Sequence, residues 1–146
     1  MFRLAIVSAL VLATAAAVPA QDKATYAVVV NAKNACKQTG DKAKNTVKKL
    51  FLKEMTKWPG GKACKPYSRK KGEAFSAFTK SVLGMKDAQL ARHWLKMKNL
   101  NGTTPPKEVS SGRMVLKYVA KYEGALGIVK IADAEKAKGI KILYRF

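Results

Sequence analysis

The sequence predicts one α/β domain, in which helices flank a mixed, mostly parallel sheet, and three observations support this class. Residues 26–30 form a near-continuous apolar run, which is typical of a strand that helices cover on both faces. Residues 41–55 carry apolar side chains at helical spacing, and a second strand is predicted at residues 63–67, after a Trp-Pro-Gly-Gly turn. The length of 146 residues suits one domain better than two.

The first strand, helix and second strand form a unit that favours a right-handed parallel crossover. A helix is expected from near residue 74 to residue 83, where Gly84 suits its end. Asp87 is expected to cap the next helix, and Ser110 or Ser111 a further one. Two strands, at residues 125–129 and 140–144, close the chain around a short helical segment at residues 132–138.

The amino terminus has the pattern of a secretory signal peptide. Arg3 gives a positive start, residues 4–18 are small or apolar, and Val18 and Ala20 stand where signal peptidase prefers small residues. The apolar run is shorter than the ~20 residues of a membrane span. We therefore expect residues 1–20 to be removed before Gln21, residues 21–146 to form the domain, and the protein to be periplasmic or secreted.

The charge of the chain indicates an anionic partner. It has 29 Lys and Arg residues against 9 Asp and Glu residues, a formal net charge of +20. A small oxyanion, an acidic polymer and an anionic membrane surface all suit this charge. Nucleic acid is disfavoured, because export removes the chain from most of it and the sequence shows no aromatic and basic platform.

Cys36 and Cys64 leave a disulfide open, because export would permit one. If their neighbouring strands were parallel, the two residues would lie at opposite ends of the sheet. Two cysteines and His93, the one histidine, do not make a zinc site, and a lone histidine on a helix is most often structural. No nucleophile and base stand at a catalytic spacing, so we expect neither enzyme activity nor a cofactor.

The loop at residues 69–72, Arg-Lys-Lys-Gly, is the predicted ligand site. A strand that ends in a glycine-containing loop and opens a helix points backbone N–H groups at a ligand, and the positive helix end favours an anion. Asn31 follows the first strand, where open α/β sheets place ligand loops, and Ser76 could add a hydroxyl. The candidate anion-binding residues are therefore Arg69, Lys70, Lys71, Gly72, Ser76 and Asn31.

The order of several short motifs resembles one family. These motifs are Val-Val-Val-Asn at residues 28–31, Trp-Pro-Gly-Gly at 58–61, Pro-Pro-Lys-Glu-Val at 105–109 and Gly-Ala-Leu-Gly-Ile-Val at 124–129. Together they resemble the small periplasmic phosphate-binding-protein-like domains, relatives of the substrate-binding component of phosphate ABC transporters. The resemblance implies a type 2 periplasmic binding fold, phosphate recognition and a partner such as a transporter membrane component or another envelope protein.

The ligand loop departs from the pattern of that family. Arg69 and Gly72 are kept, but Glu73 stands where the family has Ser, and Lys71 where larger phosphate binders often have Asp. Glu73 would repel a dianion unless it turns away or pairs with Lys70 or Lys71. The resemblance also implies two lobes in full-length members, and this chain has the size of one. The alternative is a basic interaction module that has lost the ligand and binds an acidic polymer, an anionic membrane or a protein.

Overall fold

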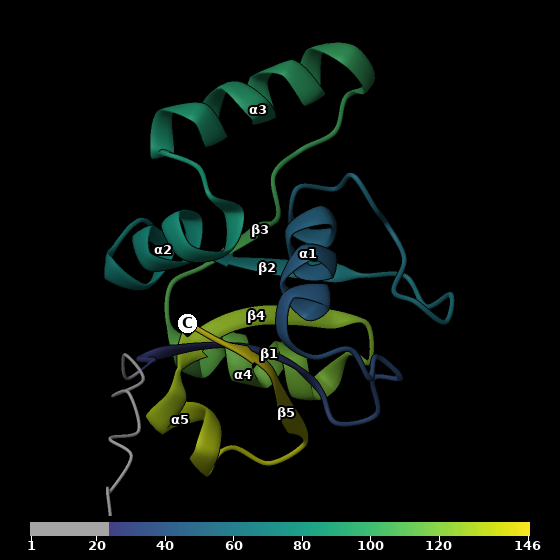
Figure 1. Ribbon diagram of the computed structural model, residues 1–146, viewed down its shortest axis with the longest axis vertical. Helices are drawn as coiled ribbons and strands as arrows, with labels where there is room; N and C mark the ends of the chain where they lie inside the picture. Colours follow the sequence, from purple (N-terminus) through teal and green to yellow (C-terminus); the bar gives the residue numbers. More distant parts are fainter. Residues whose placement is uncertain (1–23) are drawn as a thin grey trace, which may run out of the picture.

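The computed structural model describes residues 24–146, which form a central sheet with helices on both faces (Figure 1). The predicted signal peptide lies outside the described residues. The elements are β1 (Tyr26–Asn31), α1 (Gly40–Phe51), β2 (Lys65–Arg69), α2 (Glu73–Phe78), the π-helical η1 (Thr79–Leu83), α3 (Asp87–Asn101), β3 (Lys107–Val109), α4 (Gly112–Lys121), β4 (Ala125–Lys130), α5 (Ile131–Lys136) and β5 (Ile140–Arg145).

The sheet has the strand order β3-β2-β4-β1-β5. Strand β2 pairs in parallel with β3 and β4, whereas β1 pairs antiparallel with β4 and β5. Four strands therefore run in one direction and β1 runs against them, which confirms the α/β class and the mixed, mostly parallel sheet.

The predicted parallel crossover from β1 to β2 is wrong, because β4 lies between the two strands. Residues 125–129 of β4 are buried on both faces, whereas Lys65 at the start of β2 is exposed. The more apolar strand takes the central place beside β1, with Val28 opposite Ile128. As a result β1 and β2 point in opposite directions.

The opposite directions of β1 and β2 also change where the two cysteines are expected to lie. Cys36 follows the end of β1 and Cys64 precedes the start of β2, so both lie at the same end of the sheet. Cys36 is buried in a hydrophobic cluster, and the partly buried Cys64 packs against that cluster. Both thiols are free in this structure. Within residues 24–146, no three His, Cys, Asp or Glu side chains come together as a metal site.

The two faces of β1 bury different helices, because successive side chains of a strand point to opposite faces. Val28 and Val30 belong to the cluster that includes Leu50 of α1 and two residues of η1, Val82 and Leu83. Val29 belongs to a second cluster, with Val115 of α4. The domain thus has a core on each side of the sheet, and each buried aliphatic side chain contributes about 1.5–3 kcal/mol.

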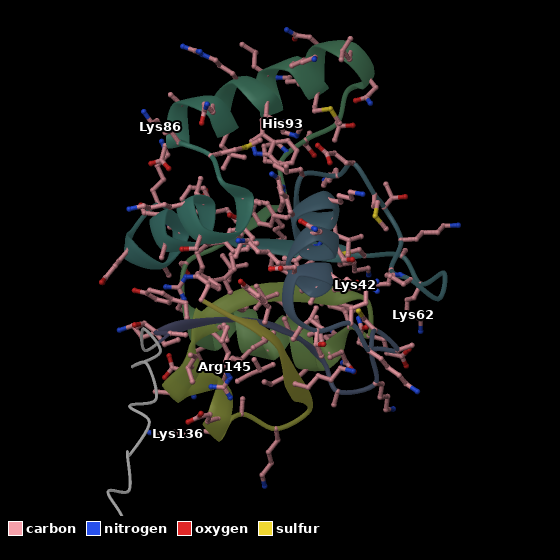
Figure 2. All side chains as sticks on the ribbon, in the orientation of Figure 1. Lys42, Lys62, Lys86, His93, Lys136 and Arg145 are labelled. Carbon is pink, nitrogen blue, oxygen red and sulfur yellow. The ribbon has the colours of Figure 1, made fainter. Side chains whose placement is uncertain are left out.

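Helix α3 extends away from these layers, at the top of Figure 1. Its one buried residue is Leu90, and the ring of His93 lies 3.1 Å from the carbonyl oxygen of Leu52. His93 therefore points from α3 towards the body of the domain, where it has a structural contact (Figure 2). Leu95 and Leu100 are exposed. Among residues 24–146, no helix has both the length and the apolar character that crossing a membrane requires.

Candidate functional site

The predicted strand, cationic loop and helix are present at the carboxyl end of β2. Lys70 donates a backbone hydrogen bond of 3.2 Å to the carbonyl of Val109, which ties the loop to β3. The backbone N–H of Ser76 donates to the carbonyl of Gly72 at 2.9 Å, where α2 starts. Lys70, Lys71 and Gly72 are exposed. The loop is therefore held at both ends while its cations face solvent.

Arg69 lies against the amino terminus of α4. A Cβ atom added to Gly112 would be 2.9 Å from Nη1 of Arg69 and 3.8 Å from Oδ2 of Asp133. A Cβ at this position would crowd the guanidinium group, so the flexible Arg69 side chain would have to shift. A cation at the positive end of a helix is unfavourable by about 0.3–1 kcal/mol, whereas an anion there is favourable. The Arg69 guanidinium and the first turn of α4 thus form a positive region beside the Asp133 carboxylate.

The side chain of Ser111 caps α4, and its Oγ accepts a hydrogen bond of 3.2 Å from the backbone N–H of Met114. This confirms the expectation that a serine starts the helix. The backbone N–H groups of Gly112 and Arg113 belong to the first turn, where an α-helix offers no internal acceptor. They remain available to a ligand.

Glu73 occupies the first turn of α2, where a carboxylate stabilises a helix. Burial raises the pKa of the Tyr26 hydroxyl, the Glu73 carboxylate raises it further, and Arg69 opposes them. Glu73 and Arg69 thus both lie within electrostatic reach of the Tyr26 hydroxyl. The ion pairs of the described residues include none between Glu73 and Lys70 or Lys71.

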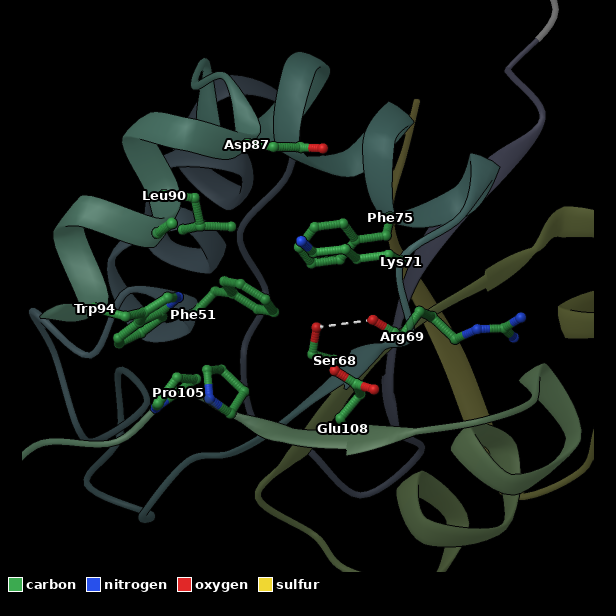
Figure 3. A pocket seen from close by; sticks show the side chains of 12 residues that line it. Phe51, Ser68, Arg69, Lys71, Phe75, Asp87, Leu90, Trp94, Pro105 and Glu108 are labelled. Carbon is green, nitrogen blue, oxygen red and sulfur yellow. Dashed lines mark hydrogen bonds between the residues drawn. The ribbon is translucent and has the colours of Figure 1, made fainter.

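A pocket of about 320 Å³ lies between the end of β2 and α3, and Arg69 is among the residues that line it (Figure 3). Phe51, Phe75 and Trp94 line it, and Lys71 extends beside Phe75. The side chain of Arg69 points away from this pocket in Figure 3. The Arg69 side chain thus lies at α4, whereas the Lys71 side chain lies at the aromatic pocket.

The structure does not bring Ser76 and Asn31 to Arg69. Ser76 is exposed and lines another hollow, beside Lys80. Asn31 lies at the opposite end of the sheet, because β1 runs against β2. Its Nδ2 donates to the carbonyl oxygens of Val119 at 2.9 Å and Ala120 at 3.0 Å, which is a structural role.

Sequence reasoning missed Gly112, Asp133 and Tyr26 as neighbours of Arg69. A signal for Gly112 was present, because the Ser-Ser-Gly segment at residues 110–112 precedes an amphipathic helix in the same way that the cationic loop precedes α2. No pattern in the sequence around Tyr26 or Asp133 indicated that these residues lie near Arg69. They reach the site through the antiparallel pairing of Tyr26 with Lys130 at the end of β4.

Comparison with solved structures shows which fold this is. An ABC-type phosphate transport receptor from Vibrio cholerae matches 83% of this chain with a TM-score of 0.59 and 16% identity. The protein has the type 2 periplasmic binding fold. PstS from Borrelia burgdorferi matches 83% of the chain with a TM-score of 0.60 and 15% identity.

The match covers 46% of the Vibrio cholerae protein and 47% of the Borrelia burgdorferi protein, so this chain spans about half of their lengths. No protein-family model matches the sequence, and no curated protein matches it either. At this level of identity the likeness establishes the fold, and the ligand has to be argued from the residues of this chain.

Proposed function

We propose that this protein is an exported solute-binding domain that captures a small oxyanion, with phosphate as the first candidate, and catalyses no reaction on it. The observation that carries the proposal is the guanidinium group of Arg69 against Gly112 at the amino terminus of α4. The side chain and the helix end are both positive, so an anion within reach of the Arg69 guanidinium and of the first turn of α4 would be stabilised by both, with the Asp133 carboxylate nearby.

The donors at this place suit a tetrahedral oxyanion. Arginine presents a planar fork of N–H groups that matches two oxygens of a phosphate at once. The first backbone N–H groups of α4 add donors of fixed direction, and the exposed Lys70 adds a mobile positive charge. The structures that share the fold are described as phosphate proteins, which supports the same ligand class.

The carboxylates of Glu73 and Asp133 favour a protonated oxyanion over a fully ionised one. Phosphate carries at least one proton near neutral pH, and a carboxylate can accept a hydrogen bond from it. Sulfate carries no such proton and would be repelled. The proposal therefore includes a preference for phosphate over sulfate.

The donors named above approach the anion from one side, that of β2, α2 and α4. Charge interactions that stay open to water are screened and weak. We propose that a partner, such as a transporter membrane component or another envelope protein, covers the other side.

The test is calorimetric titration of residues 21–146 with phosphate and with sulfate at physiological salt. The Arg69→Ala variant should bind phosphate about 10- to 100-fold more weakly, since a hydrogen bond to a charged group contributes about 1.5–3 kcal/mol. Arg92→Ala, which removes the same charge from exposed α3, is the matched control and should stay within about twofold. No saturable heat with phosphate, or equal losses in both variants, would refute the proposal.

A further inference from the structure

Three tyrosines and three lysines that are distant in sequence meet on the α4 side of β2 and β3. The rings of Tyr67 and Tyr118 stack with centroids 5.0 Å apart and an angle of 5° between their planes. We call the set the tyrosine–lysine platform, and it consists of Lys65, Tyr67, Lys107, Tyr118, Lys121 and Tyr122.

Each lysine of the platform lies over a tyrosine ring. Nζ of Lys65 is 4.3 Å and Nζ of Lys121 is 5.3 Å from the centroid of Tyr122. Nζ of Lys107 is 5.4 Å from the centroid of Tyr118. These are cation–π distances, and they restrict ammonium groups that would otherwise move freely. Each such contact is weak at an exposed site, so the rings only favour positions of the three charges near one another.

Strand and helix periods explain why the platform forms. Lys65 and Tyr67 are two apart on β2, so they share a face, and Lys107 is the register partner of Tyr67 on β3. Tyr118 and Tyr122 are four apart on or next to α4, so they share a side of the helix. With about 3.3 Å per residue along a strand and about 4.8 Å between strands, the Cα atoms of Lys65 and Lys107 are about 8 Å apart.

No ion pair among the described residues balances the charge of the platform lysines. The ion pairs of the described residues join Lys62 to Glu123 and Arg145 to Glu135, and neither uses a platform lysine. Burial raises the pKa of Tyr67, and its neighbours Tyr122 and Tyr118 raise it further. The Tyr67 phenol thus lies close to the other two rings and keeps its proton, and a phenol can both donate and accept hydrogen bonds.

These features decide the class of ligand. Proteins that bind single-stranded nucleic acid stack bases on free aromatic faces, but here cations and a neighbouring ring already occupy these faces. Tyr67 is buried in the second core cluster, so the platform offers the exposed ammonium groups of its three lysines beside the partly buried Tyr118 and Tyr122. A sugar polymer with carboxylate groups presents the matching pattern, because its hydroxyls can pair with the phenols. A polyphosphate chain presents acceptors alone.

We propose that the tyrosine–lysine platform binds an acidic polysaccharide. This surface is separate from the oxyanion site, because Lys65 begins β2 and Arg69 ends it. The two proposals can therefore fail independently. Together they describe a domain that attaches to an anionic polymer through one surface and binds a small anion at another.

The test titrates the whole chain with a defined oligomer of polygalacturonate at several salt concentrations. In Lys65→Gln/Lys107→Gln/Lys121→Gln, affinity should fall more than about 30-fold, and the slope of log affinity against log salt should decrease by about 2–3. The matched control, Lys42→Gln/Lys98→Gln/Lys136→Gln, removes the same charge from exposed sites on α1, α3 and α5 and should lose less than about threefold. Equal losses in the two triple variants would overturn the proposal.

Two further measurements keep the test decisive. Amide shifts of the unaltered protein should move at Tyr67, Tyr118 and Tyr122 on titration, a readout that does not depend on whether a variant folds. Polyphosphate and single-stranded DNA of the same total charge should bind at least about tenfold more weakly than polygalacturonate. Tighter binding of either polymer, or shifts elsewhere that leave the platform unmoved, would overturn the proposal.

Discussion

Strand β4 and helix α3 show how differently the same residue type behaves in two parts of this molecule. Leu126 of β4 is completely buried, whereas Leu95 of α3 is 61% exposed. The strand lies between β1 and β2 with helices on both faces, and the helix extends beyond the layers. Burial here depends on the layer an element belongs to, and the apolar character of the residue alone does not decide it.

Removal of side-chain volume from β4 should have the largest effect on stability. Leu126→Ala should lower the free energy of unfolding by about 2–5 kcal/mol, because it opens a cavity in a close-packed core between Val30 and Pro66. Denaturant unfolding followed by circular dichroism measures this change. A loss below about 1 kcal/mol would mean that the centre of the sheet is looser than its burial indicates.

The pH dependence of stability that arises from Cys64 shows whether the water-free core reaches the start of β2. Burial raises the pKa of its thiol to about 12, with Lys53 opposing, above the value of 9.0 for a free thiol. The folded state then keeps a proton that the unfolded state loses, so stability should fall as pH rises from about 9 to 12. Each unit of pKa difference corresponds to about 1.4 kcal/mol.

The measurement compares the unfolding free energies of the protein and of Cys64→Ala across this pH range. The packing lost with the sulfur is constant with pH, so the difference between the two proteins should shrink as pH rises. A constant difference would show that the thiol is accessible to water and that the core ends before Cys64.

The smallest effect is expected on α3. Leu95→Ala should change the free energy of unfolding by less than about 0.5 kcal/mol, because exposed side chains away from special features contribute little. The comparison with Leu126→Ala uses the same chemical change at two places. A loss above about 1.5 kcal/mol in Leu95→Ala would mean that α3 packs against another surface in solution.

Much of the local structure could be predicted from the sequence. The apolar run of β1, the end of η1 at Gly84 with its left-handed conformation and the serine cap of α4 follow from short-range patterns. Strand β3 was not predicted, because it has three residues and begins with a lysine and a glutamate. Residues 107–109 form a strand because they pair with β2, and their own sequence does not indicate a strand.

The candidate site was predictable in part. The loop of Arg69 and Gly72 forms where the strand and helix pattern placed it. Asn31 did not join the loop, since its position depended on the direction of β1 relative to β2. The direction of β1 is set by its pairing with β4. Strand β4 lies far along the chain, and local sequence patterns do not show which strand pairs with β1.

The sequence by itself determined most of the elements, the positive charge and the cationic loop, because these depend on side-chain periodicity and on composition. The tertiary structure alone decided that β4 separates β1 from β2, that Arg69 meets α4 and that the tyrosine–lysine platform forms. The physical reason is that the periodicity of a helix or strand fixes which of its faces each residue occupies. Strand order is instead chosen by competition among all apolar segments for the positions that are buried on both faces.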